Sequence, residues 1–310
     1  MKILFITYTR IGDAVLSSGV LNYLVDRYPD AHFTIVCGPL AASLFDAVPR
    51  LDQVIVMTKR PFDGHWLSLW RAVRAVKWDL VIDLRRSLVS YFIPARKRHV
   101  LGSTDNTIHR VQLLSTVLDM AEPADPYLYV APKNEEAAVR LIPKDISVLA
   151  IAPLAADPGK TWPAGRFAVL GQRLLDMGGP CQGWRVAVFG GPGDAEAAGP
   201  VIEALKEYKP ISMLGQTDLL TVYAALKRCR AFIGNDSGLA HLAAAADLPT
   251  LAIFGPTDPV CYGPWGERCQ VVRADSTDPQ VEELEPENVE AAFRHLMASF
   301  PEQVQGGDSK

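Results

Sequence analysis

The residues best suited to chemistry stand together at positions 236–241, where the sequence is Asp-Ser-Gly-Leu-Ala-His. An apolar run precedes them and small residues follow, which predicts a buried strand, a polar turn and a helix. Asp236 or Ser237 can cap this helix, and Gly238 lets a ligand approach the backbone N–H groups at its start. Those groups attract anions, and His241 lies one turn further along. The segment predicts either an anion-binding site or an ordinary capped helix with a buried histidine.

Asp13 is a second candidate, because it follows an apolar segment at residues 2–8 and the glycine at position 12. A strand that ends in a tight turn at Gly12 would place Asp13 at or near the N-terminus of a helix. An aspartate at this position can cap the helix, or it can act as a general base at the edge of a cleft. The residue types alone leave both roles open.

Lys160 is a third candidate, in a polar segment at 153–163 that follows an apolar run. Residues 159–161 (Gly-Lys-Thr) are similar to the end of a nucleotide triphosphatase P-loop, but that motif needs a glycine where this chain has Leu154. The P-loop is therefore excluded. A lysine after a strand end can still neutralise a phosphate as a point charge, or it can be a solvated surface side chain.

Two further polar segments follow expected strands in the second half of the chain. Residues 189–196 include Gly191 and Asp194, whose backbone and carboxylate could contact a phosphate or a ribose, although an ordinary glycine-rich turn fits equally well. The segment lacks the G-x-G-x-x-G spacing, which argues against a dinucleotide-dependent dehydrogenase. Residues 254–266 form a long Gly/Pro-rich connection that includes Thr257, and loops of this length are often functional.

The elements that position these residues alternate between strand and helix in both halves of the chain, which predicts parallel sheets covered on both faces. At 310 residues, with 49% hydrophobic and 21% charged residues, the composition is that of a soluble globular protein of two domains. A polar, proline-bearing segment at 122–145 ends the first half. We therefore predict domains at 1–144 and 145–310. The expected strands lie at 2–8, 32–37, 53–57, 80–83, 147–152, 185–189, 231–233 and 250–254.

Charge is distributed unevenly along the chain. The first 144 residues carry 18 Lys and Arg against 14 Asp and Glu, a balance of +4, and the remainder has a balance of −8. Ten of the basic residues lie between Lys59 and Arg98, against three acidic ones. A solvated helix face explains part of this block. The rest favours an anionic acceptor or an anionic membrane surface over nucleic acid, because no nucleic-acid-binding motif accompanies the charge.

Composition also limits the cofactors and the compartment. The five cysteines are odd in number and lack C-x-x-C spacing, and the six histidines lack metal-ligand spacing, so neither a disulfide framework nor a metal site is predicted. The sequence has neither an apolar run of about 18 to 20 residues nor the layout of a cleavable signal, so we expect a cytoplasmic protein.

The first three segments, in this order and at these distances, resemble the ADP-heptose:lipopolysaccharide heptosyltransferase family of bacterial glycosyltransferases. The marks of that family are a Gly-Asp turn after the first strand, a Lys-x-Trp-Pro segment and an Asp-[Ser/Thr]-Gly-x-x-His helix start. They stand here at 12–13, 160–163 and 236–241. The resemblance extends from residue 1 to about residue 300.

The resemblance implies the GT-B architecture, with two Rossmann-like domains whose parallel sheets face a central cleft. The first domain would bind the acceptor and the second the nucleotide-sugar. A last helix at 286–300 would pack back on the first domain, and residues 301–310 would form a disordered tail. The implied reaction is an inverting, metal-independent transfer of heptose from ADP-heptose to the inner core of lipopolysaccharide, with no cofactor.

The resemblance also implies roles for individual residues. Asp13 would remove the proton of the acceptor hydroxyl, and Lys160 would stabilise the leaving diphosphate. The donor-binding residues would be Gly12, Lys160, Gly191, Asp194, Thr217, Asp236, Ser237, Gly238, Leu239, Ala240, His241 and Thr257. The acceptor-binding residues would be Arg10, Arg85 and Arg86. The implied partners are an ADP-sugar and an anionic glycolipid, with peripheral contact at the cytoplasmic face of the inner membrane, no nucleic acid and a monomeric state.

Three alternatives remain open at this point. Ala155 and Ala156 stand where many relatives have hydroxyl residues, so a different nucleotide-activated sugar could be transferred in glycan or O-antigen assembly. A nucleotide-sugar epimerase of the same architecture would need acid and base carboxylates beyond Asp13. A catalytically inactive protein would bind a nucleotide-sugar without consuming it.

Overall fold

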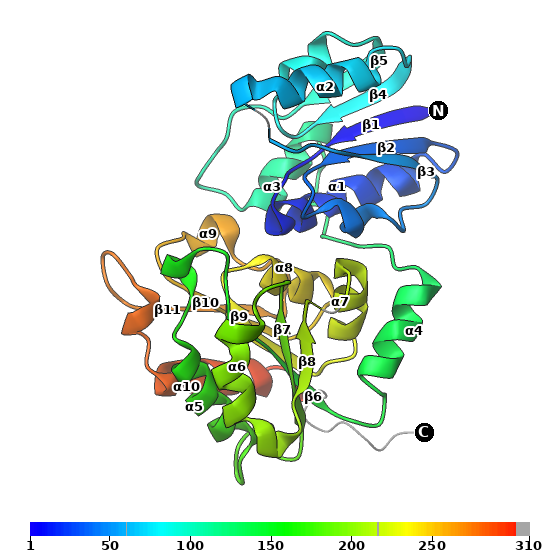
Figure 1. Ribbon diagram of the computed structural model, residues 1–310. Helices are drawn as coiled ribbons and strands as arrows, with labels where there is room; N and C mark the ends of the chain where they lie inside the picture. Colours follow the sequence, from blue (N-terminus) through cyan, green and yellow to red (C-terminus); the bar gives the residue numbers. More distant parts are fainter. Residues whose placement is uncertain (60, 216, 302–310) are drawn as a thin grey trace. The chain divides into compact units, whose positions relative to one another are not determined.

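The computed structural model describes residues 1–59, 61–215 and 217–301. The chain divides into two compact units, Met1–Val130 and Ala131–Lys310. Each unit contains one parallel sheet with helices on both of its faces (Figure 1). The predicted α/β class with two parallel sheets is therefore confirmed.

The first unit holds a five-stranded sheet in the order β3-β2-β1-β4-β5, in which every pair of neighbours is parallel. Its strands are β1 (Lys2–Ile6), β2 (His32–Cys37), β3 (Leu51–Val56), β4 (Trp78–Asp83) and β5 (Ala95–Val100). In this register Ile6 stands between Val36 of β2 and Asp83 of β4. The strand order changes direction beside β1, and ligands of open parallel sheets bind at the carboxyl ends of the strands at such a point.

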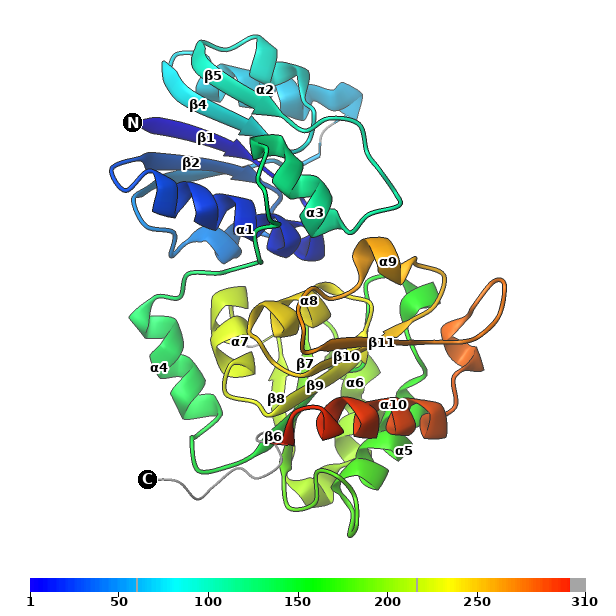
Figure 2. The same cartoon turned by 180° about the vertical axis from the view of Figure 1, so that it is seen from behind.

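Helices cover both faces of the first sheet. They are α1 (Ile11–Arg27), α2 (Gly64–Val73) and α3 (Arg110–Ser115), with short 3₁₀ helices η1 (Ala42–Phe45), η2 (Pro61–Asp63), η3 (Leu88–Tyr91) and η4 (Thr116–Leu118). Helices α1 and α3 contact each other on one face, and α2 lies on the other (Figures 1 and 2). Leu69 and Val73 of α2 belong to a buried cluster with Leu4 and Ile6 of β1.

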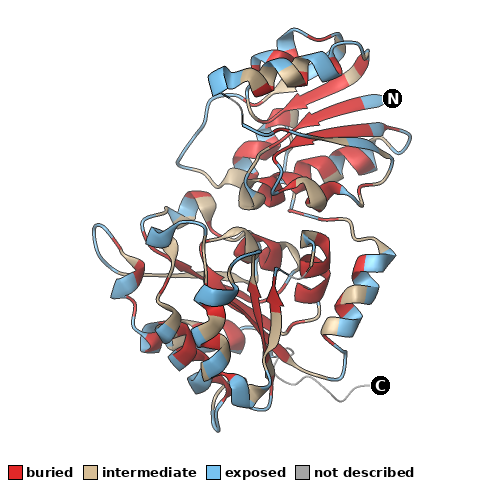
Figure 3. Cartoon of the chain, in the orientation of Figure 1, coloured by how far each residue is buried: buried red, intermediate tan, exposed pale blue. Residues whose placement is uncertain are grey.

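The second unit holds a six-stranded sheet in the order β11-β10-β9-β6-β7-β8, again with parallel neighbours. Its strands are β6 (Val148–Ala152), β7 (Arg185–Gly190), β8 (Ile211–Leu214), β9 (Ala231–Asn235), β10 (Thr250–Phe254) and β11 (Cys269–Arg273). Every residue of β6, β9 and β10 is buried, as expected for strands that helices cover on both faces (Figure 3).

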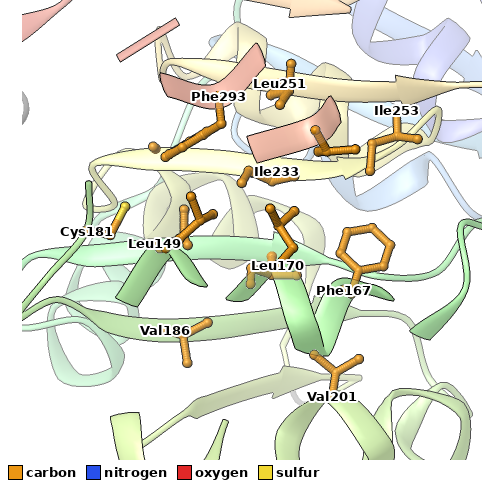
Figure 4. Packing of buried hydrophobic residues seen from close by; sticks show 14 of the residues in the cluster. Leu149, Phe167, Leu170, Cys181, Val186, Val201, Ile233, Leu251, Ile253 and Phe293 are labelled. Carbon is orange, nitrogen blue, oxygen red and sulfur yellow. The ribbon is translucent and has the colours of Figure 1, made fainter. Parts of the chain in front are cut away.

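The helices of the second unit are α4 (Pro132–Leu141), α5 (Ala164–Leu175), α6 (Ala195–Ala204), α7 (Leu219–Leu226), α8 (Gly238–Ala245), α9 (Pro259–Tyr262) and α10 (Pro286–Ala298), with η5 (Pro158–Lys160), η6 (Lys206–Tyr208) and η7 (Val281–Glu283). Helices α5, α6 and α10 pack on one face of the sheet. Figure 4 shows this core, in which Phe167 and Leu170 of α5 and Phe293 of α10 meet side chains of the strands.

The division between the units falls at 130/131, earlier than the boundary predicted at 144/145. Helix α4 belongs to the second unit because it packs against α7. There the Asn134 side-chain amide donates to an Asp218 carboxylate oxygen at 3.0 Å and to the Thr221 hydroxyl at 2.9 Å. The acceptor and donor roles assigned to the two domains stay predictions.

Helix α10 buries Val289, Phe293 and Leu296 in the core of the second unit, against α5 and β10. Its expected packing on the first domain stays a prediction. Except for Pro301, the predicted tail at 301–310 lies outside the described residues. Among the helices that the structure describes, none combines the length and the apolar character that a membrane crossing requires.

Candidate functional site

Five loops at one edge of the second sheet carry the residues that sequence analysis assigned to the donor in this unit. The loops follow β10, β9, β6, β7 and β8, which are consecutive neighbours in the sheet. Because the strands are parallel, their carboxyl ends lie at the same edge. In this order the loops contain or lead to Thr257, Asp236, Lys160, Asp194 and Thr217. The topology therefore brings together five segments that are far apart in sequence.

An ion pair joins the β6 and β9 loops. Lys160 Nζ donates to Asp236 Oδ2 at 2.6 Å. The Asp236 side chain is only 7% exposed and that of Lys160 26% exposed. Removing one partner of such a largely buried ion pair leaves the charge of the other partner uncompensated. The Lys160 side chain is therefore held by Asp236, just before helix α8 begins, and is not a solvated surface lysine.

Asn235, the last residue of β9, fixes the same loop by a second contact. Its Oδ1 accepts a hydrogen bond from the backbone N–H of Trp162 at 3.0 Å, and the residue is fully buried. The Trp162 indole is also fully buried and donates to the Leu284 carbonyl oxygen at 2.8 Å. Within the Lys-x-Trp-Pro segment, Lys160 is therefore held by Asp236, and Trp162 is held by Asn235 and by the Leu284 carbonyl oxygen. Asn235 was not among the predicted site residues, because an amide at the end of an apolar strand is its only feature in the sequence.

Helix α8 begins at Gly238 directly after this strand. Ser237 occupies the N-cap position with an extended backbone, but its hydroxyl makes no capping bond and is buried without a partner among the described residues. Asp236 pairs with Lys160 instead of capping, so the expected side-chain cap is wrong. The N–H of Ala240 donates to the Ser237 carbonyl oxygen at 3.2 Å. Gly238 and Leu239 come before Ala240 in the first turn, and the N–H groups at the start of a helix have no acceptor within that helix.

His241 lies in the first turn of α8 and is buried, in agreement with both interpretations of the motif. The adjacent residues Leu242, Ala243 and Ala244 are buried as well.

The β7 and β8 loops approach each other closely. Asp194 Oδ2 accepts a hydrogen bond from the Gly191 N–H at 2.7 Å, which closes the turn before α6. Gly215 has a positive φ of 60°, and a side chain there would come within 2.7 Å of the Pro192 backbone, so glycine is required. The Thr217 hydroxyl is buried without a partner in the described part of the chain. Asp194 is thus engaged in a turn, while Thr217 retains an unused hydroxyl.

The β10 loop carries Thr257, which is half-buried. The next residue, Asp258, caps α9 by accepting from the Val260 N–H at 2.9 Å. Asp258 therefore has a structural role, whereas Thr257 stays a candidate for donor contact.

Asp13 in the first unit lies at the carboxyl edge of its own sheet. Helix α1 begins at Ile11, with Arg10 in the extended N-cap position and exposed. Gly12 is therefore the second residue of a helix and not a tight turn, which corrects the expectation from sequence. Asp13 is half-buried in the first turn, where the helix dipole favours a carboxylate.

Arg85 and Arg86 follow β4, the strand beside β1. Asp83 at the end of β4 is fully buried and accepts from the N–H of Arg85 and from both the N–H and the hydroxyl of Ser87. The Arg85 guanidinium lies 4.9 Å from the centre of the Trp66 ring. Partial burial lowers the pKa of Arg85 from its ordinary value, which is the direction expected for a desolvated cation. Arg86 is exposed with a positive φ of 57°.

Among the described residues, no three or more His, Cys, Asp or Glu side chains are grouped so that they could hold a metal ion. The carboxylates at the two edges are engaged with protein groups, as in the Lys160–Asp236 pair and the Asp194 turn. At the carboxyl edge of the second sheet, the groups available to a ligand are the N–H groups at the start of α8, the Lys160 ammonium group and the buried hydroxyls of Ser237 and Thr217.

The sequence profile of the family described as Glycosyltransferase family 9 (heptosyltransferase) matches residues 95–290. The chain belongs to glycosyltransferase family 9. The match includes the Lys160 and Asp236 loops and therefore the whole helix start. The resemblance found in the sequence is confirmed, and this family 9 chain is a glycosyltransferase enzyme.

Named relatives agree with this membership. The family 9 chain is 26% identical to lipooligosaccharide heptosyltransferase 2 of Haemophilus influenzae and 27% identical to lipopolysaccharide heptosyltransferase 2 of Salmonella typhimurium, and each alignment covers 88% of both chains. Among solved structures, a glycosyl transferase family 9 protein of Veillonella parvula has a TM-score of 0.79 at 24% identity, covering 96% of this chain and 97% of that one. The E. coli ADP-heptose lipopolysaccharide heptosyltransferase II has a TM-score of 0.78 at 23% identity, with 96% and 99% covered. These likenesses confirm the GT-B fold.

Proposed function

We propose that this family 9 chain transfers a heptose from an ADP-heptose to the inner core of lipopolysaccharide, with inversion at the anomeric carbon. The family supports this assignment, as do the relatives, which are named as heptosyltransferases acting on lipopolysaccharide or lipooligosaccharide. The observation that carries it is the lysine fixed at the start of α8 by Asp236 at 2.6 Å. The proposal includes action as a monomer at the cytoplasmic face of the inner membrane.

The leaving diphosphate is the first part of the reaction that these residues serve. An ammonium group has three N–H donors, and the bond to Asp236 uses one of those of Lys160. The other two are available to phosphate oxygens. The N–H groups of Gly238 and Leu239 and the positive end of the α8 dipole would add to the stabilisation of the developing charge. In this proposal no divalent metal is needed to neutralise the diphosphate.

Asp13 serves the other half of the reaction in this proposal. Its carboxylate accepts the proton of the attacking acceptor hydroxyl, and the resulting alkoxide forms the new bond as the diphosphate leaves. Arg10, Arg85 and Arg86 bind anionic groups of the acceptor. Gly191, Asp194, Thr217 and Thr257 contact the nucleotide or the sugar, together with Ser237, Ala240 and His241. Gly12 precedes Asp13 and allows close approach.

The base assignment is tested by Asp13→Asn, with Asp26→Asn in the same helix as the matched control. Transfer should fall by about 10²- to 10⁴-fold in the first variant, the usual contribution of a general base. Its affinity for ADP, measured by titration calorimetry, should change less than about threefold, and the control should behave like the wild type. Near-normal turnover of Asp13→Asn would contradict the assignment.

The donor assignment is tested separately by thermal shift with ADP, UDP and GDP and their sugars, each with and without magnesium. We expect stabilisation by ADP and ADP-heptose that is independent of magnesium and weaker in Lys160→Ala. Lys133→Ala on the exposed side of α4 is the control. Stabilisation by UDP or GDP alone would favour transfer of another sugar, and donor binding without transfer to any acceptor would favour an inactive binding protein.

A further inference from the structure

A pocket of about 330 Å³ opens in the second unit at the edge of the sheet opposite the α8 start. It is lined by the connections that lead into β6, β9 and β10, at the amino ends of these strands. All the residues assigned to the donor in this unit follow carboxyl ends instead. A volume of this size falls at the lower end of the range for small-molecule sites, about 300 to 1,000 Å³.

The lining of this pocket is strongly basic. Lys144 comes from the connection into β6, and Lys227, Arg228 and Arg230 come from the connection between α7 and β9. Asp247 is the one acidic residue of the lining. It is bridged at 3.6 Å by a further cation, Arg268.

Arg228 is fixed at the pocket with part of its hydrogen-bonding capacity unused. Its Nε donates to the Ile142 carbonyl oxygen. Its Nη2 is buried and has no hydrogen-bond partner among the described residues. A buried charged donor without an acceptor costs free energy. This nitrogen therefore indicates that an acceptor belongs near the guanidinium.

The negative ends of the neighbouring helix dipoles are too weak to balance the positive charge of the pocket lining. The pocket lies at the C-termini of α7 and α8, and each terminus is equivalent to roughly −0.5 elementary charge. Those two termini and Asp247 together oppose the four cations with about −2 charges, before the Arg268 bridge is considered. At least two positive charges therefore remain, and an anionic phosphate group would neutralise them.

We propose that this pocket binds a small phosphate-bearing anion, at a site separate from the one assigned to the donor. The planar guanidinium groups of Arg228 and Arg230 suit the oxygen geometry of phosphate, and the two lysines supply mobile point charges. The concave shape and the sequestered Arg228 nitrogen favour a soluble compound over the flat surface of a membrane.

The test uses the full chain carrying Lys160→Ala, so that phosphate binding at the α8 start is weakened and does not mask the pocket. Inorganic pyrophosphate is titrated by calorimetry at fixed ionic strength. In this background we compare Lys144→Gln/Arg230→Gln, whose side chains have no ion-pair or hydrogen-bond partner among the described residues, with Lys133→Gln/Arg140→Gln on α4. Both double variants remove two positive charges from the same unit.

We expect saturable, one-to-one pyrophosphate binding in the background protein and in the α4 control. The pocket variant should bind at least about tenfold more weakly while keeping the same melting temperature. Equal binding by both double variants, or no saturable binding in the background protein at millimolar pyrophosphate, would overturn the proposal. Phosphatidylglycerol vesicles form a second arm, in which both variants should sediment equally. A specific loss of vesicle binding in the pocket variant would assign the pocket to a lipid headgroup and overturn the soluble ligand.

Discussion

Asn235 connects two motifs that sequence analysis treated separately. Its amide oxygen accepts from the Trp162 N–H, and Lys160 lies two residues before that tryptophan. The residue after Asn235 is Asp236, the ion-pair partner of Lys160. One buried side chain therefore aligns the lysine loop with the helix start, which makes Asn235 a positioning residue for the proposed diphosphate site.

Replacing Asn235 by Leu keeps a similar volume but removes the acceptor. The buried Trp162 N–H is then unpaired, which should lower the free energy of unfolding by about 1 to 3 kcal/mol. If the amide positions Lys160, the KM for the sugar donor should also rise by about tenfold, equivalent to 1.4 kcal/mol, while the KM for the acceptor stays the same. Urea unfolding and steady-state kinetics measure the two effects. Lower stability with an unchanged donor KM would reduce Asn235 to a structural role.

The spacing of the motifs singled out Lys160 and Asp236, because strand ends and helix starts are readable from hydrophobic pattern and small residues. The structure pairs their side chains, and their roles in donor binding stay predictions. The bond between these side chains spans 76 residues and depends on the order of strands in the sheet, which no local pattern gives. The partnered amide of Asn235 was missed for the same reason.

At the scale of elements, all the predicted strands but β3 contain runs of buried residues, and no residue of β3 is buried. Three of the described strands were not predicted: β5, β8 and β11, each of which is an edge strand of its sheet. The sequence of β5 is Ala-Arg-Lys-Arg-His-Val, so part of the basic block lies on an edge strand and not on a helix face. Charged residues on an edge strand discourage pairing with other chains, but they remove the apolar signal of a strand.

Helix α4 was missed for a related reason. Half of its ten residues are polar, and Asn134 is one of its two buried residues. Its attachment to α7 is a hydrogen-bond network around Asp218, which also caps α7 by accepting from the Thr221 N–H at 2.8 Å. Hydrophobic periodicity does not detect a helix that is fixed in this way.

We therefore expect Asp218→Ala to destabilise the second unit. The loss of the cap costs about 1 kcal/mol, and the buried Asn134 amide loses a partner, which adds about 1 to 2 kcal/mol. Urea unfolding followed by tryptophan fluorescence measures the change. Glu135→Ala on the exposed side of α4 is the control and should stay within about 0.5 kcal/mol of the wild type. A similar small effect for Asp218→Ala would show that apolar packing alone attaches the helix.

At the scale of the whole molecule, each unit has a core of its own. The α2 face of the first sheet buries one cluster, and the α5, α6 and α10 face of the second sheet buries another. Alternation of strands and helices was enough to predict two parallel sheets. It did not place the boundary, because α4 precedes the second sheet in sequence and belongs to it by packing.

Free thiols are buried in both units, so their reactivity can be used to follow the unfolding of each unit. Cys37 is buried in the first unit, and Cys181, Cys229 and Cys261 are buried in the second. Burial, with a smaller contribution from Asp46, raises the pKa of Cys37 from 9.0 to about 12. Burial likewise raises the pKa of Cys181 and Cys229. The thiolate is the reactive form, so these groups should resist alkylation at pH 8.

The raised thiol pKa values also give a direction for stability. The unfolded chain releases thiol protons as the pH rises through about 8.5 to 9, whereas the folded chain retains them up to higher pH. The contribution of the thiols to stability is therefore complete below about pH 8.5 and is lost as the pH increases toward 12. At pH 8 the stability contributed by the thiols is retained, and a fraction of the thiols in the unfolded chain is ionised and can react.

Alkylation by iodoacetamide at pH 8, analysed by mass spectrometry of each cysteine peptide, can then follow the two units separately. In the native protein we expect the four buried thiols to stay unmodified. The half-buried Cys269 should react slowly at most, because burial and Asp247 raise its pKa to about 12. All five thiols should react in guanidinium chloride. Because the clusters are separate, Cys37 should become reactive at a different denaturant concentration from Cys181 and Cys229, which should change together. Coincident transitions for all three thiols would contradict independent units and would show that the chain unfolds as one cooperative body.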